Sequence, residues 1–252
     1  MIWDCLMSRV YADTIEPRKP TQDITLGTTG ETITLPGNDL RVNTVKDKGG
    51  NTLWTSDGSG TLSNVHSGLK GSLVLLNTTT ASGAANVTFG SSLITSTYDL
   101  YIVKWINVNP ATDNTQLWFN GSTDGGSTYN ITKTTTAYQA YYNESGGSTY
   151  AVQYLAGSDL ADGDAGTTYQ KVSGDIGGDA DESTSGEMHL YSPSSTTFTK
   201  HFYVRAQEYG AGNQAGDWYI GGMFTNTAAI NAIQFKMSTG NLDGIFKLYG
   251  LS

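Results

Sequence analysis

Short runs of alternating apolar and polar residues, separated by glycine, serine and asparagine, make up most of this chain. The densest run is residues 98–108, rich in the aromatic and β-branched types that fit a half-buried pleated surface. Its even positions are apolar except Lys104, and its odd positions are mixed. A strand with two partly apolar faces is expected at the centre of a sheet or beneath a neighbouring subunit.

The residues that follow this run predict a turn, a second strand and another turn. Asn109-Pro110 is expected to end strand pairing, because proline has no amide donor and restrains the residue before it. Residues 116–120 resume as a strand, and Asp124-Gly125-Gly126 closes it with a tight turn.

The same alternation predicts further strands in the rest of the chain. They are expected at 73–76, 87–89, 131–142, 150–155, 168–172, 187–191, 198–206, 218–225, 230–238 and 245–251. Residues 77–86 are expected to form a turn, Gly221-Gly222 a bulge, and the last strand a hairpin with the one before it. Because each of two sheets must bury one face, these strands predict an all-β fold, an antiparallel β-sandwich of jelly-roll type.

Residues 1–67 differ from the remainder, and we expect two domains, 1–67 and 68–252. Segments 10–27 and 42–58 resemble each other loosely, each with a short strand, a turn-rich interval and a second short strand. Strands with so little apolar content do not build an independent core. We therefore expect an extended N-terminal anchoring and oligomerisation arm, lying on a neighbour or wrapped with its copies around a threefold axis, which predicts a homotrimer.

The first residues carry the apolar side chains expected to anchor this arm on another chain. These are Ile2, Trp3, Leu6, Met7, Val10 and Ile15. The alternative is a hydrophobic tip folded back on its own domain. Since Arg9 follows only a few apolar residues, the segment is expected to be neither a signal peptide nor a membrane span.

Composition and charge argue against several classes of protein. With 15% charged and 11% aromatic residues, the chain is unlike disordered sequences. Its net charge of −9 and the lack of a basic stripe predict no binding to nucleic acid or anionic membranes. Cys5 is the single cysteine, so no intrachain disulfide forms, which fits assembly in a reducing cytoplasm.

Metal and catalytic patterns are sparse. Asp159, Asp162 and Asp164 form the one calcium candidate, although their spacing is irregular and ordinary solvated acidity is the simpler explanation. His189 and His201 lie in neighbouring predicted strands, but a zinc site requires a third ligand. There is no nucleophile elbow or metal-protease motif. We therefore expect no cofactor and no enzyme activity.

Tyrosines and tryptophans are concentrated in the second half of the chain. The candidates are Tyr138, Tyr141, Tyr142, Tyr150, Tyr209, Trp218 and Tyr219. They suit a subunit interface, where these types are enriched, or a sugar-stacking platform, since aromatic rings have apolar faces and a polar edge. A tyrosine-rich core and rim is the third alternative.

Three segments carry a resemblance to a known group of proteins: Leu93 to Lys133, residues 186–197 (GEMHLYSPSSTT) and residues 233–241 (IQFKMSTGN). Together they resemble a family of uncharacterised virion-associated structural proteins, decoration- or fibre-like, of tailed phages from marine and freshwater bacteria. The resemblance spans about Leu73 to Leu251. It implies a component of a phage particle, and it implies no catalytic residues.

These observations lead to one functional hypothesis and one alternative. The hypothesis is a non-enzymatic virion protein, assembled in the host cytoplasm, that serves as a surface-exposed capsid decoration or head-fibre protein anchored by its N-terminal arm. Its expected partners are its own copies and other virion proteins, such as the major capsid protein or tail components. The alternative is a tail-fibre or receptor-binding protein whose β-sandwich binds a host surface glycan.

Overall fold

A computed structural model of the chain describes residues 42–66, 73–146, 150–162 and 168–251. The predicted anchors Ile2 to Ile15 lie outside this range, as does Asp164. The chain divides into two compact units between His66 and Ser67. Within the described residues, no helix has the length and apolar character needed to cross a membrane.

The first unit contains a small antiparallel sheet. Its strands are β1 (Thr44–Lys46), β2 (Thr52–Ser56) and β3 (Leu62–Ser63), in the order β1-β2-β3. Aspartates hold both turns: Asp47 accepts from the Asn51 backbone N–H at 2.8 Å, and Asp57 accepts from that of Ser59 at 2.7 Å. None of residues 42–66 is buried, so this part of the unit has no core of its own.

The second unit is a β-sandwich built from the remaining strands. They are β4 (Leu73–Ala84), β5 (Val87–Phe89), β6 (Leu100–Pro110), β7 (Leu117–Ser122), β8 (Lys133–Asn143), β9 (Tyr150–Tyr154), β10 (Gln170–Lys171), β11 (Thr184–Tyr191), β12 (Lys200–Gly210), β13 (Gln214–Phe224), β14 (Ala232–Met237) and β15 (Leu242–Leu251). A single 3-10 turn at Ala156–Ser158 follows β9, and the described residues contain no α-helix.

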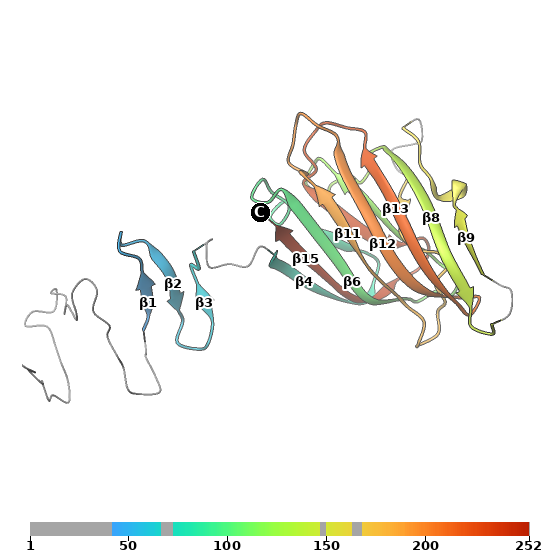
Figure 1. Cartoon of the computed structure of the whole chain (residues 1–252), viewed down its shortest axis with the longest axis horizontal. Coiled ribbons are helices and arrows are strands. Elements are labelled where there is room, and N and C mark those ends of the chain that lie inside the picture. Colours follow the sequence, from blue (N-terminus) through green and yellow to red (C-terminus); the bar gives the residue numbers. More distant parts are fainter. Residues whose placement is uncertain (1–41, 67–72, 147–149, 163–167, 252) are drawn as a thin grey trace, which may run out of the picture. The chain divides into compact units, whose positions relative to one another are not determined.

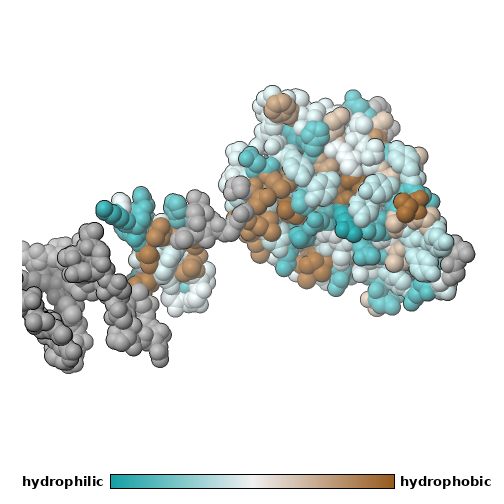
Figure 2. Space-filling model, viewed as in Figure 1, coloured by the Kyte–Doolittle hydropathy of each residue, from teal (hydrophilic) through white to brown (hydrophobic). Residues whose placement is uncertain are grey.

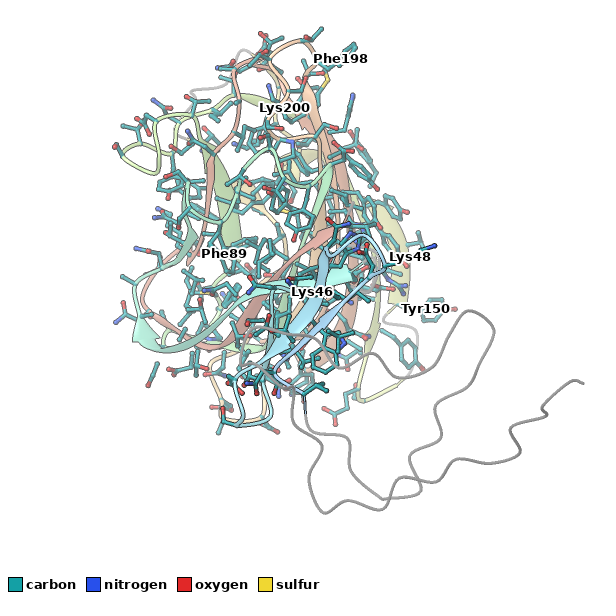
Figure 3. The ribbon with its side chains drawn as sticks, turned by 90° about the vertical axis from the view of Figure 1, so that its left-hand side faces the viewer. Lys46, Lys48, Phe89, Tyr150, Phe198 and Lys200 are labelled. Atoms are coloured by element: carbon teal, nitrogen blue, oxygen red, sulfur yellow. The ribbon has the colours of Figure 1, made fainter. Side chains whose placement is uncertain are left out.

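Two antiparallel sheets face each other in this unit. The larger has the order β4-β15-β6-β11-β12-β13-β8-β9, and the smaller has the order β10-β7-β14-β5. Figure 1 shows the larger sheet face-on, with β9 at one edge, and Figure 3 shows the layers from the side. The all-β antiparallel fold predicted from alternation is confirmed.

Side chains from both sheets form the core between them. Along β14, Ile233, Phe235 and Met237 are buried, and Gln234 and Lys236 between them are half-buried, which matches the predicted alternation. Phe119 of the smaller sheet meets Phe202 of the larger one edge-on, with ring centroids 5.0 Å apart. Such a pair adds about 0.5–1.5 kcal/mol to the burial of the rings themselves.

Three local predictions were wrong. Strand β4 continues through residues 77–84, because its threonines pair along β15 where a turn was expected. Gly221 and Gly222 lie in unbroken register between β12 and β8, without a bulge. The last strand forms no hairpin with β14, since β15 pairs with β4 and β6 in the other sheet.

Candidate functional site

The solvent-facing side of the larger sheet, called here the outer face, presents most of the predicted aromatic residues. On β8, β9 and β13, the register places Tyr138 beside Tyr219 and Tyr154, and Tyr142 beside Tyr150. The rings of Tyr138 and Tyr219 stack in parallel, 4.8 Å apart at 4°. The Arg205 guanidinium lies over the Tyr219 ring at 5.2 Å. The faces of Tyr219 are thus covered, and its hydroxyl donates to Asp217 Oδ2 at 3.0 Å.

Two of the predicted aromatic residues do not belong to this face. Trp218 is buried between the sheets at 6% exposure, where its Nε1 donates to Glu208 Oε1 at 2.9 Å. Tyr141 alternates with Tyr142, so it points to the opposite side of β8. Tyr209 lies on the outer face and donates its hydroxyl to Glu144 Oε2 at 2.6 Å, which raises the pKa of Tyr209 to about 12.

A groove crosses the strands of the outer face. Three adjoining hollows of about 420, 320 and 230 Å³ meet at Gln207. We call this feature the cross-strand groove. Its lining includes Ile106, Ser185, Gln207, Asp217, Ala215, Ala140 and Tyr142. No local sequence pattern indicates this groove, because it depends on the register of five strands.

Ion pairs form one wall of the groove. Lys104 Nζ lies 3.0 Å from Glu187 Oε2, and Arg205 Nη2 lies 3.0 Å from Asp217 Oδ2. Burial alone raises the pKa of Glu187, but hydrogen bonds from Lys104 and His189 outweigh it and hold that pKa below its usual value. The hydrogen bond to Asp217 raises the pKa of Arg205. Both cations on this wall are therefore paired with carboxylates.

A second polar hollow, of about 180 Å³, opens beside Glu208 on the inner side of the larger sheet. Glu208 is 4% exposed and also accepts a short hydrogen bond from the Gly174 backbone N–H. Burial raises its pKa to about 7, against the opposing effect of its two donors. Sequence reasoning missed this residue, although alternation along β12 places it inward with Val204 and Ala206.

A buried lysine lies at the other end of the same sheet. Lys133 is 2% exposed, and its Nζ donates to Asn120 Oδ1 at 2.7 Å and to the carbonyls of Ile131 and Thr168 at 2.8 and 3.1 Å. Burial lowers its pKa to about 7. These hydrogen bonds link β7 and the segment before β10 to β8. The role of Lys133 is therefore structural.

An apolar area lies at the β4 edge of the outer face. Leu73 and Leu75 are about half exposed, and they pair with Leu251 and Tyr249 of β15. Figure 2 shows hydrophobic side chains gathered at this edge. Exposed apolar side chains that are contiguous in this way are typical of contact surfaces between proteins.

The metal candidates are not brought together. In the described part of the chain, no three histidine, cysteine, aspartate or glutamate side chains gather to hold a metal. Asp159 instead accepts hydrogen bonds from the Ala137 backbone at 2.7 Å and from the Tyr154 hydroxyl. His189 stacks on Tyr203 at 4.4 Å and contacts Glu187.

Comparison with known proteins adds no relative: no family model, no curated protein and no solved structure matches this chain.

Proposed function

We propose that this protein is a non-enzymatic structural component of a tailed-phage virion, most simply a capsid decoration or head-fibre protein. The observation that supports it best is the division into two units of different character. The described part of the first unit is a sheet of three short strands without a buried residue, whereas the second has an extensive core. An attachment arm joined to a self-sufficient displayed domain has this organisation.

Two finer features belong to the same proposal. The sandwich is of jelly-roll type, because its chain passes repeatedly between the two sheets, as from β5 to β6 to β7 to β8. The arm binds copies of itself as a homotrimer, since sheets with no core of their own are stabilised by burying each other. The resemblance of residues 73–251 to virion-associated proteins supports the assignment to a particle.

Protein composition of purified particles tests the proposal. Particles of a phage that encodes this chain are banded by density and digested for mass spectrometry. The chain is expected in the particle in many copies, and immunogold labelling is expected on the head. Its presence in infected cells but not in particles contradicts a structural role. Particles that lack the protein are expected to lose resistance to heat or osmotic shock.

A second candidate is a tail-fibre or receptor-binding protein that recognises a host surface glycan. The groove on the outer face favours it, since ligand sites are concave and have a few placed polar groups. Labelling at the tail tip favours this candidate over decoration. Adsorption of phage to cells that is blocked by the purified protein is the matching functional result.

A further inference from the structure

We infer that the cross-strand groove binds an extended, uncharged oligosaccharide, an inference that rests on the second candidate function. The groove crosses the strands, running from Ile106 on β6 over β11, β12 and β13 to Ala140 on β8. Four strand spacings of about 4.8 Å give it a length of about 19 Å. This length suits a chain of several sugar rings better than a single ring.

The side chains along the groove match a ligand rich in hydroxyl groups. Gln207 is exposed, and its side-chain amide forms no hydrogen bond with any described residue, so it has both donors and an acceptor to offer. Ser185 and Asp217 lie on either side of it in the register. Because a sugar hydroxyl both donates and accepts, this mixture of amide, hydroxyl and carboxylate can bind one at each strand crossing.

Charge argues for an uncharged ligand. Lys104 pairs with Glu187 and Arg205 pairs with Asp217, so the wall presents two cations and two anions. A phosphate backbone needs cations free to replace its counterions, and this wall has none that is unpaired. An uncharged polymer of hydroxyl groups is complementary to paired ions, since it accepts from the cations and donates to the carboxylates.

The aromatic residues define how such a ligand is recognised. Since the Tyr219 ring lies between Arg205 and Tyr138, and its hydroxyl donates to Asp217, Tyr219 offers a ligand no open ring face. Binding therefore depends on hydrogen bonds more than on stacking against Tyr219. A protein partner is less well matched, because interface centres are depleted of charge and contain apolar anchors. Exposed apolar side chains of the outer face gather instead at its two edge strands, β4 and β9.

The experiment is binding of the full-length protein to an array of immobilised neutral and acidic oligosaccharides, followed by calorimetric titration of the best neutral probe. Gln207→Trp fills the groove, and Arg205→Ala removes the donors on its wall. Each is expected to weaken binding about tenfold or more. Gln153→Trp, at an exposed position of β9 outside the groove, is the matched control and is expected to bind as the wild type.

The outcomes separate the site from the function. If the wild type binds no probe, both the groove inference and the glycan-binding candidate are overturned. If it binds and Gln207→Trp binds equally well with an unchanged melting temperature, the groove is wrong while the candidate function stands. Binding confined to acidic probes overturns the uncharged ligand class. The position of the protein on the particle is measured independently of all three results.

Discussion

Because the pKa of Lys133 is lowered, the stability of the folded protein is expected to change with pH in the alkaline range. Its folded-state pKa is about 7, against about 10.4 in an unfolded chain. Between these values the unfolded chain binds a proton that the folded protein does not, so stability rises with pH, by up to about 5 kcal/mol. Lys133→Met is expected to abolish this rise in urea unfolding measured from pH 6.5 to 10.

A lysine of the outer face provides the control for this measurement. Lys247→Met, on the outer face of β15, is expected to leave the alkaline rise in place. If the wild type shows no rise above pH 7, the buried amine is not held in its neutral form.

Glu208 predicts the opposite trend on the acid side. Its folded-state pKa of about 7 exceeds the value of about 4.3 expected in the unfolded chain. Its contribution is complete below pH ~4.3 and is lost as pH rises to about 7, a change of about 4 kcal/mol. Glu208→Gln keeps an acceptor for Trp218 and is expected to remove this decline from unfolding curves.

Replacing Glu187 provides a control for Glu208, because the pKa values of these two residues are shifted in opposite directions. The pKa of Glu187 is lowered, so its contribution is present above the unfolded value and is lost as pH falls. Glu187→Gln is therefore expected to change the profile only at acid pH, below about 4.3. A decline between pH 4.3 and 7 that persists in Glu208→Gln contradicts the assignment to Glu208.

Residue type alone does not predict burial in these strands, because the position of a residue in the alternation decides which face of the sheet its side chain occupies. Trp218 was grouped with the exposed tyrosines because it is aromatic, yet it alternates in phase with Ile220 and Phe224, which are buried. Lys133 and Glu208 show the converse. Alternation assigns both to the inner face, but their polar side chains weigh against burial until the partners that satisfy them are known.

Strands were the most predictable elements. Each predicted interval from residue 73 onward contains a strand, because a sheet with one buried face imposes a period of two on its sequence. Pairing was less predictable. The segment at 77–84 reads as polar turn, but its threonines suit an edge strand that only one neighbour pairs. The cross-strand groove depends on pairings far apart in sequence, which no local pattern encodes.

Strand β9 is an edge with exposed apolar side chains. Tyr150, Val152 and Tyr154 are 63%, 79% and 63% exposed, and β9 ends the sheet order. Unpaired edge strands of this kind associate with other chains, and a lysine in the edge strand opposes this association. Val152→Lys is expected to lower the amount of higher assemblies seen by light scattering at high concentration.

A substitution of the same type tests whether position on the edge matters. Thr134→Lys places the charge on the outer face of β8, which has a neighbouring strand on both sides. It is expected to have little effect on the amount of higher assemblies. Equal behaviour of the two variants contradicts association through the β9 edge.

At the scale of the whole molecule, the second unit is expected to fold alone. The core cluster contains residues from Ala81 to Leu248 and none from residues 42–66, the described part of the first unit. A fragment of residues 67–252 is expected to unfold cooperatively at nearly the melting temperature of the full chain and to be monomeric in light scattering. If the fragment is unfolded, the first unit contributes to the core; if it is trimeric, the arm does not determine the oligomeric state.

The two buried ionisable groups act together on the whole unit. Along β13, the partners of Glu208 and Lys133 are Gly216 and Phe224, about 27 Å apart at the usual rise of a strand. Effects at this separation add. The pH profile is therefore expected to have a minimum near neutrality, where many proteins have their maximum.

The pairing of Leu73 with Leu251 places the beginning and the end of the sandwich on adjacent strands. A short peptide linker can therefore join them, and new termini can be opened in an exposed loop such as the β12–β13 turn. Such a circular permutant is expected to keep the fold. A cargo fused after Leu251 emerges where β15 pairs with Leu100, six residues along β6 from the groove residue Ile106, so the domain can be engineered as a display scaffold with the cargo beyond the end of that surface.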